Sequence, residues 1–429
     1  MTPAPPVTPE IACVRTAEGV VVIGGHAEGT ALSAVTLALP LAGAERAAVL
    51  AAPLLAACWA RAVARTARRS GATVRTEPVV TADYAGVTVE CVRSDRAVLC
   101  EVPQWCADGS AGPEPEFDAA FDAVRAECLA RLASDDRWSD GIRRALFGRS
   151  HRYGIGHDER TAFLTACGPE EAARLSGTLR ASPPVLALSH TEPSALRRLA
   201  EAASGTPIRR TVRSTARPAV RSTARPADGP AEEPPGQPVR TVTFSAPAGP
   251  GLAYHLLGTP GVPLGSPDKA AVHLAWAVLG GREGLFDRRL RGERALTYSL
   301  AAFSREFGHA GYGMTVAGCA PEAIGEVAAE THAVITALAD RGCEAALLES
   351  ARERLIIQFL RAAQNGRSVT ERLCGYGIAG VDPGESCRYP DRLAAVTPYD
   401  LRRAARRYIA AHGGREHLGT TAGGEESTG

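Results

Sequence analysis

The pattern of hydrophobic and polar residues runs through the same order of elements twice along the chain. In each half, two strand-like stretches come first, followed by a helical stretch, two further strand-like stretches and a group of helices. In the first half the predicted strands are 19–24, 33–41, 83–92 and 97–102, and the predicted helices are 48–68, 116–134, 139–147 and 169–179. In the second half the strands are 240–246, 252–258, 295–303 and 310–318, and the helices are 270–279, 321–342, 344–363, 368–379 and 398–409.

Strands and helices that are grouped in this way favour an α+β fold. We predict two similar domains, each built on a mostly antiparallel sheet that is covered by helices on one face. This similarity between the domains rests on the recurring order of elements alone. Residue identity between the halves is too low to show a repeat.

A segment rich in Pro, Arg, Ser and Thr separates the two halves. It spans 206–238 and contains a tandem octad, 212–219 and 220–227, with too few large apolar groups to offset the entropy of ordering. We predict a disordered linker, with domains at 10–205 and 239–412 and a flexible tail at 413–429. Six arginines between Arg209 and Arg225 could bind an acidic surface, but a solvated tether is the favoured interpretation.

The composition is that of a soluble globular protein, with 45% apolar and 22% charged residues in 429. The formal charge of +1 gives no electrostatic case for nucleic acid or an anionic membrane as a partner. No secretory signal is visible, and the longest apolar run, 47–60, is too short to cross a bilayer. Eleven cysteines without CxxC spacing are typical of reduced, buried thiols, so we expect a cytoplasmic protein.

The candidate site lies in the second half. Gly280-Gly281 is followed by Leu285-Phe286, then by Leu290-Arg291, and Tyr298 comes seven residues beyond the arginine. An arginine fork can hold a substrate carbonyl or carboxylate with two hydrogen bonds. A tyrosine hydroxyl can donate to the oxygen that gains charge as a peptide carbonyl becomes tetrahedral. Both side chains could therefore contact a peptide.

The motif and its spacing resemble the C-terminal domain of peptidase family M16, the pitrilysin and insulinase type of zinc peptidase. The similarity covers most of 240–410 and also rests on the segments 310–313, 320–322 and 396–398. It implies that Arg291 and Tyr298 contact the substrate and its transition state. The alternative is that Arg291 is a surface helix charge and that Tyr298 is a strand residue packed beside Leu296 and Leu300.

The first half resembles the N-terminal domain of the same family but lacks its metal motif. That domain carries His-x-x-Glu-His on a helix, with zinc held by the histidines and its bound water activated by the glutamate. In register, this chain has Pro53-Leu54-Leu55-Ala56-Ala57. The third ligand would lie near Arg131, with Glu127 about one turn away. We therefore expect no metal and no other cofactor in this chain.

The strand predicted at 83–92 resembles the one on which M16 enzymes lay an extended substrate. An exposed edge there could accept a peptide by strand addition. A strand that is paired on both sides is an equally good interpretation of the sequence.

The resemblance implies one subunit of a two-chain zinc peptidase. Its partner, an M16 chain with His-x-x-Glu-His, would supply the zinc, and this chain would supply Arg291 and Tyr298 to a peptide substrate such as a precursor with a leader. The alternative is a catalytically inactive scaffold or peptide-binding protein. A lone peptidase with unusual ligands would require zinc to copurify with the isolated chain.

Overall fold

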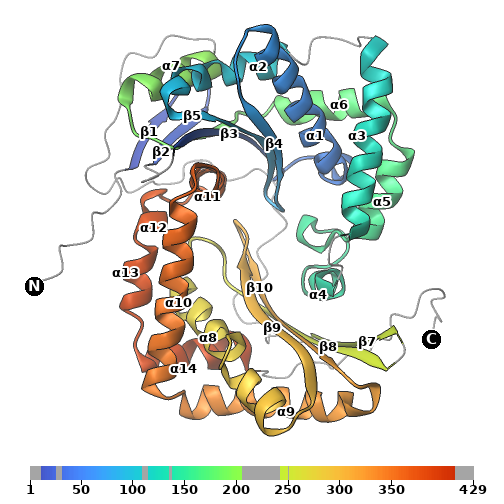
Figure 1. The fold of residues 1–429 in the computed structure, drawn as a ribbon, viewed down its shortest axis with the longest axis vertical. Coiled ribbons are helices and arrows are strands. Elements are labelled where there is room, and N and C mark those ends of the chain that lie inside the picture. Colours follow the sequence, from blue (N-terminus) through green and yellow to red (C-terminus); the bar gives the residue numbers. More distant parts are fainter. Residues whose placement is uncertain are drawn as a thin grey trace, which may run out of the picture. The chain divides into compact units, whose positions relative to one another are not determined.

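The computed structural model describes residues 11–25, 31–108, 115–134, 138–204, 242–249 and 251–410. The predicted linker at 206–238 and the predicted tail at 413–429 lie outside these residues. The chain divides into two compact units (Figure 1). Unit 1 draws its described residues from 1–135, 157–231 and 359–389, and unit 2 draws its own from 136–156, 232–358 and 390–429.

Unit 1 is built on a six-stranded mixed sheet in the order β1-β2-β6-β3-β5-β4. The strands are β1 (Ile11–Arg15), β2 (Val21–Gly25), β3 (Leu32–Pro40), β4 (Arg75–Val80), β5 (Tyr84–Val92) and β6 (Val185–Leu188). Only the pairing of β2 with β6 is parallel. Its helices are α1 (Arg46–Arg69), η1 (Arg93–Glu101), α2 (Val102–Asp108), α3 (Pro115–Ser134), α5 (His157–Ala166), α6 (Pro169–Arg180), α7 (Pro193–Ser204), α11 (Gly366–Ile378) and α12 (Gly384–Cys387).

Helices cover both faces of the central strands of this sheet, whereas the sequence predicted one covered face. On one face, Leu373 and Cys374 of α11 join a buried cluster with Ile23 and Ala38. On the other face, α1 packs against β4 and β5. In Figure 1, α11 lies on the opposite side of the sheet from α1, α2 and α7. Both alternating sets of side chains in β3 and β5 are therefore buried, so these strands show almost no polar alternation.

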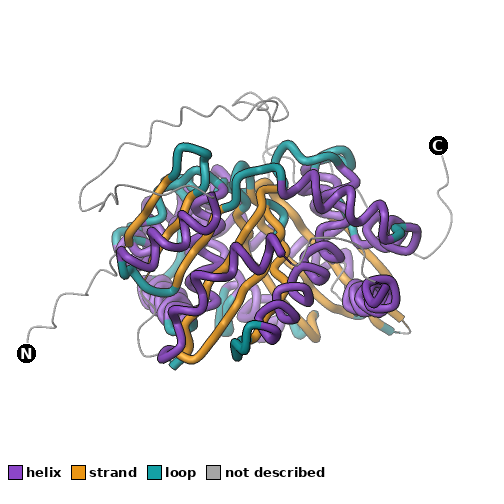
Figure 2. The backbone as a smooth tube through the Cα atoms, turned by 90° about the horizontal axis from the view of Figure 1, so that it is seen from above, coloured by secondary structure: helices purple, strands orange, loops and turns teal. Residues whose placement is uncertain are grey.

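Unit 2 is built on a four-stranded antiparallel sheet in the order β7-β8-β10-β9. The strands are β7 (Val242–Gly249), β8 (Leu252–Pro260), β9 (Thr297–Glu306) and β10 (Gly311–Cys319). The helices are α4 (Trp138–Phe147), η2 (Arg152–Gly154), α8 (Lys269–Gly280), η3 (Asp287–Glu293), η4 (Pro321–Ala323), α9 (Ile324–Arg341), α14 (Pro398–Ala404) and η5 (Ala405–Ile409). Two further helices, α10 (Ala345–Ala363) and α13 (Tyr389–Ala394), each cross a boundary between the units. Helices make up most of the described chain outside the two sheets (Figure 2).

Each sheet takes a covering helix from the other half of the sequence. In unit 1, Thr36 of β3 bonds through its hydroxyl oxygen to those of Thr88, at 2.8 Å, and Thr370 of α11, at 2.7 Å. In unit 2, Ile142 of α4 packs fully buried against Leu256 and Met314. Neither unit is therefore formed by one continuous half of the chain.

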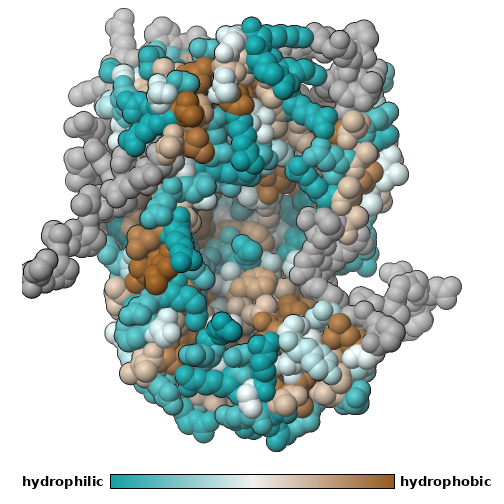
Figure 3. All heavy atoms as spheres, viewed as in Figure 1, coloured by the Kyte–Doolittle hydropathy of each residue, from teal (hydrophilic) through white to brown (hydrophobic). Residues whose placement is uncertain are grey.

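Helix α1 is long and apolar enough to cross a membrane by length and composition alone. However, 61% of its most apolar window is buried, and it packs against β4, β5, α5 and α6. This is the position of a core helix. The face of the molecule in Figure 3 is mostly hydrophilic, with small hydrophobic patches.

The strand predicted at 97–102 is wrong. This segment forms η1 and the start of α2, because Leu99, Val102 and Trp105 are the buried residues and their spacing of three places them on one helical face. In the sequence, this segment is too short for a helical spacing of three residues to be distinguished from a strand pattern.

Residues 1–205 produced without the rest of the chain should fail to unfold cooperatively, because the sheet would expose the surface that α11 covers. Co-production with residues 239–429 should restore a single thermal transition, followed by circular dichroism. The matched control is the full chain cut within 206–238 after folding, which should keep its transition temperature. A cooperative transition of 1–205 alone at the temperature of the full chain would contradict the exchange of helices.

Candidate functional site

The motif segment of unit 2 begins at a tight turn after α8. A Cβ atom at Gly280 would lie 2.4 Å from the Cβ of Ala302 on β9. One at Gly281 would lie 2.1 Å from Nη2 of Arg354, which donates to the carbonyl of Ala277 at 2.6 Å. Glycine is needed at position 280, because the backbone of Ala302 approaches too closely for any side chain, whereas at position 281 the flexible end of Arg354 is the close group.

Helix η3 is attached to α9 by a forked ion pair. Arg289 donates to both carboxylate oxygens of Glu330, at 2.7 and 3.1 Å, and to Glu293 at 2.8 Å. Arg294 pairs with Glu326 on the same helix. Hydrogen bonds from Arg289 lower the pKa of Glu330. Two-point contacts of this kind fix direction more than they add stability at a partly exposed site, so they set the orientation of the motif.

Arg291 lies on the outer side of η3 with its side chain half exposed. Its Nη1 lies 3.1 Å from Asp287 Oδ1, and its Nη2 donates to the backbone carbonyl of Tyr298 at 2.9 Å. The arginine is thus held beside the first residues of β9, while part of its guanidinium stays open to solvent.

Tyr298 lies at a β-bulge in β9. Ser299 pairs with Gly318 and Thr297 pairs with Cys319, so Tyr298 has no partner across the ladder. Its side chain is 64% exposed, whereas Thr297 beside it is buried. A bulge turns a side chain out of the regular alternation, and β9 is an edge strand of its sheet.

The packing alternative for Tyr298 does not fit this geometry. Leu296 and Leu300 pack against the buried cluster of Ala317, Cys319 and Val327, and the tyrosine is outside that cluster. Among the described residues, the tyrosine hydroxyl has no hydrogen-bond partner. Arg291 and Tyr298 therefore occupy one exposed end of β9, where both can meet a ligand.

Residues 53–57, which the sequence places in register with the M16 zinc motif, lie inside α1. Pro53 lies inside this helix and cannot donate to the carbonyl of Val49, which instead accepts from Arg160 Nη1 at 2.8 Å. Ala56 is fully buried, and Cys128 of α3 donates to the Pro53 carbonyl at 3.6 Å. Apolar contacts and the arginine Arg160 therefore surround the positions that would hold ligands in the zinc motif.

The remaining donors near this helix do not form a metal site. Arg131 pairs with Glu127 at 2.6 Å, and Arg61 holds the same carboxylate at 2.7 Å. Burial raises the pKa of Cys58 to about 12, which disfavours the thiolate that a metal requires. Within the described part of the chain, no group of three or more His, Cys, Asp or Glu side chains could hold a metal ion. The described residues around α1 therefore do not fit zinc.

The strand expected at 83–92 is β5, which is paired on both sides by β3 and β4. This settles the two interpretations of the segment in favour of a paired strand. The edge strand next to β5 is β4, a strand that the sequence did not predict. It carries Pro78 opposite Val87. Proline has no amide hydrogen to give to an added strand, so this edge is a poor template for a peptide.

Comparisons with known proteins agree with this fold. Residues 213–355 match the family model of the peptidase M16 inactive domain. No curated protein matches the chain. Matching solved structures include a protease from Helicobacter pylori, with 14% identity, a TM-score of 0.71, and coverage of 94% of this chain and 97% of that one.

Two further structures have the same fold. A peptidase M16 inactive domain from Pseudomonas fluorescens is 16% identical with a TM-score of 0.70, over 93% of this chain and 95% of that one. A chain of complex III from Candida albicans is 12% identical with a TM-score of 0.66, over 92% and 93%. Residues 213–355 are thus similar to the inactive type of M16 domain, and the fold is that of these solved structures.

Tyr298→Phe should change the free energy of unfolding by less than about 0.5 kcal/mol, because the side chain is exposed and its hydroxyl bonds nothing described. The matched control is Tyr153→Phe. Tyr153 is fully buried and its hydroxyl accepts from Arg152 at 2.8 Å and from the His309 amide at 3.3 Å, so we expect a loss of about 1–3 kcal/mol. Urea denaturation measures both. A loss above about 1 kcal/mol for Tyr298→Phe would support a packing role.

Chelation should leave the transition temperature of this chain unchanged, because its described residues offer no ligand group for a metal. A metal bound only to the folded state would raise that temperature, and its removal would lower it. We expect elemental analysis of the purified chain to find far less than one zinc per molecule, and we expect its melting temperature to be equal with and without EDTA. Stoichiometric zinc in the purified chain would show that it has ligands of its own.

Proposed function

We propose that this chain is the metal-free subunit of a two-chain M16 peptidase and that it presents Arg291 and Tyr298 to a peptide bound at the zinc site of its partner. The partner is an M16 chain with His-x-x-Glu-His. The substrate is a peptide, for example a precursor from which a leader is removed. We further propose a cytoplasmic location, because all eleven cysteines are free thiols in the structure.

One observation carries the proposal. The metal helix has lost each donor and has been rebuilt as core, whereas the Arg291–Tyr298 segment keeps its spacing, its glycine turn and its exposure. Decay of an unused enzyme would affect both regions alike. Separate fates are expected when zinc chemistry lies in a partner and substrate contacts stay in this chain.

The chemistry asked of each side chain follows from its placement. The half-exposed guanidinium of Arg291 can release the Tyr298 carbonyl and hold a carbonyl or carboxylate of the substrate. The hydroxyl of Tyr298 can donate to the oxygen that becomes negative as the scissile carbonyl turns tetrahedral. One such donor is worth about 3 kcal/mol to the transition state, or about a hundredfold in rate.

A scaffold or peptide-binding role is the second candidate. The similarity to a chain of complex III favours it, since that fold there belongs to a large assembly. An adjacent gene for an M16 chain with the zinc motif would favour the peptidase subunit. A peptide-cleavage assay decides between the two roles directly.

In that assay, the mixture of this chain and its zinc-bearing partner should cleave candidate precursor peptides, and neither chain should do so alone. Tyr298→Phe and Arg291→Ala should each lower kcat/KM about a hundredfold because they remove contacts made to the transition state. Arg282→Ala is the control: it removes the same charge from an exposed position in the neighbouring turn and should leave the rate unchanged. Full activity from the partner alone would refute the proposed role.

A further inference from the structure

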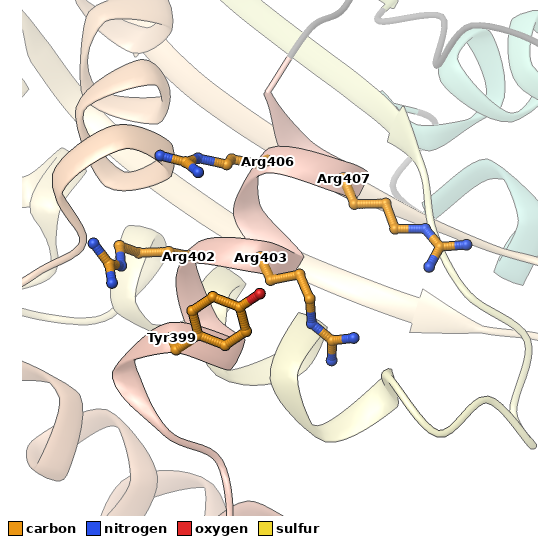
Figure 4. Close-up of a pocket in the computed structure, with 5 residues that line it drawn as sticks. All are labelled: Tyr399, Arg402, Arg403, Arg406 and Arg407. Carbon is orange, nitrogen blue, oxygen red and sulfur yellow. The ribbon is translucent and has the colours of Figure 1, made fainter.

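A basic groove lies on the last helical segment of unit 2, apart from the Arg291–Tyr298 segment in the sequence. It has a volume of about 400 Å³ and is lined by Tyr399, Arg402, Arg403, Arg406 and Arg407 (Figure 4). Thr397 starts this segment with a capping box, in which its hydroxyl accepts from the Asp400 amide at 3.2 Å. The cap makes α14 a fixed platform for the arginines that follow.

The arginines form two pairs, each with a spacing of four residues. Arg402 and Arg406 project to one side of the helix, and Arg403 and Arg407 project to the other (Figure 4). Four residues of α-helix advance about 6 Å, and slightly less where α14 passes into the π-helical η5, so each pair presents two guanidinium groups in a row along the axis. Tyr399 lies between the rows with its ring 66% exposed.

One of these pairs is partly neutralised. Arg403 lies 2.9 Å from Asp268 and 3.5 Å from Asp400, and Arg407 lies 3.7 Å from Asp268. Tyr408 also donates to Asp268 at 2.7 Å. One carboxylate is thus shared by two guanidinium groups and a hydroxyl, so the row keeps capacity for an added acceptor.

The other pair has no carboxylate within ion-pair distance among the described residues. Arg406 uses only Nε, which donates to the carbonyl of Ala339 at the end of α9 at 2.8 Å. Arg402 lays its aliphatic stem against Gly342, the left-handed residue that ends α9. These contacts leave the terminal nitrogens of both side chains free of described acceptors and hold them in position.

We propose that this groove binds an acidic peptide segment that lies along α14 and η5 over Tyr399. Carboxylates spaced two residues apart in an extended peptide are about 7 Å apart, and those spaced four apart in a helix are about 6 Å apart. Both repeats match the spacing within each arginine row. An arginine fork binds a carboxylate with two parallel hydrogen bonds, so two or more acidic side chains can be held at once.

A peptide suits this surface better than a small phosphate compound. The two rows diverge from the helix, so a single compact anion would meet at most one of them (Figure 4). The exposed ring of Tyr399 gives the aliphatic part of a peptide an apolar contact between the rows. The groove is also separate from the Arg291–Tyr298 proposal, and either can fail without the other.

The test uses the full chain and a fluorescein-labelled peptide of alternating Glu and Gly, with a Gln and Gly peptide of equal length as its uncharged match. Fluorescence anisotropy should show binding of the acidic peptide that weakens as salt rises from 50 to 300 mM, and no binding of the Gln peptide. Arg402→Gln with Arg407→Gln removes one charge from each row but keeps both side-chain stems and the bond from Arg406 to Ala339. Its affinity should fall about tenfold, as expected for two exposed ion pairs.

The charge-matched control is Arg15→Gln with Arg68→Gln, two exposed arginines of unit 1, and its affinity should equal that of the unaltered chain. Thermal melts confirm that both variants are folded. Equal binding by the two double variants, or no binding by the unaltered chain, would overturn the proposal. Tripolyphosphate that displaces the peptide at a concentration below the Kd of the peptide would overturn it as well, in favour of a phosphate compound.

Discussion

Both sheets of this protein depend on a helix that comes from the distant half of the sequence. The face of the unit 1 sheet that carries Thr36 and Ala38 is buried by α11, and the face of the unit 2 sheet that carries Met314 is buried by α4. Without these helices, one apolar face of each sheet would be exposed to water, which is unfavourable. The Arg291–Tyr298 segment and α1 therefore lie in units that each contain residues from both halves of the chain.

Within that framework, the two candidate sites have opposite physical character. Helix α1, which carries residues 53–57, is core: Pro53 costs a backbone hydrogen bond, and Arg160 supplies the missing donor to Val49. The Arg291–Tyr298 segment has stayed on the surface, where a glycine turn, a forked ion pair to α9 and a bulge keep its two side chains turned outwards. The first arrangement serves stability, whereas the second exposes groups that stability does not require.

The sequence predicts the parts of the fold that depend on local pattern. The sequence alone predicts long apolar helices such as α1, and it contains the spacing of Arg291 from Tyr298. Strand β6 was missed because four residues after a Pro-Pro pair give too little pattern, and β4 was missed because Pro78 argues against a strand. The bulge at Tyr298 depends on the register between β9 and β10, and the sheet that α4 or α11 covers depends on long-range packing. Neither follows from local periodicity.

A competition titration with the zinc-bearing partner tests the central claim most directly. With partner and substrate fixed, added chain should raise the cleavage rate to a plateau at one equivalent. The Tyr298→Phe chain should bind the partner with equal affinity and, in excess, should suppress the activity supported by the unaltered chain. Equal activity from the Tyr298→Phe chain, or a rate that does not depend on added chain, would contradict the account.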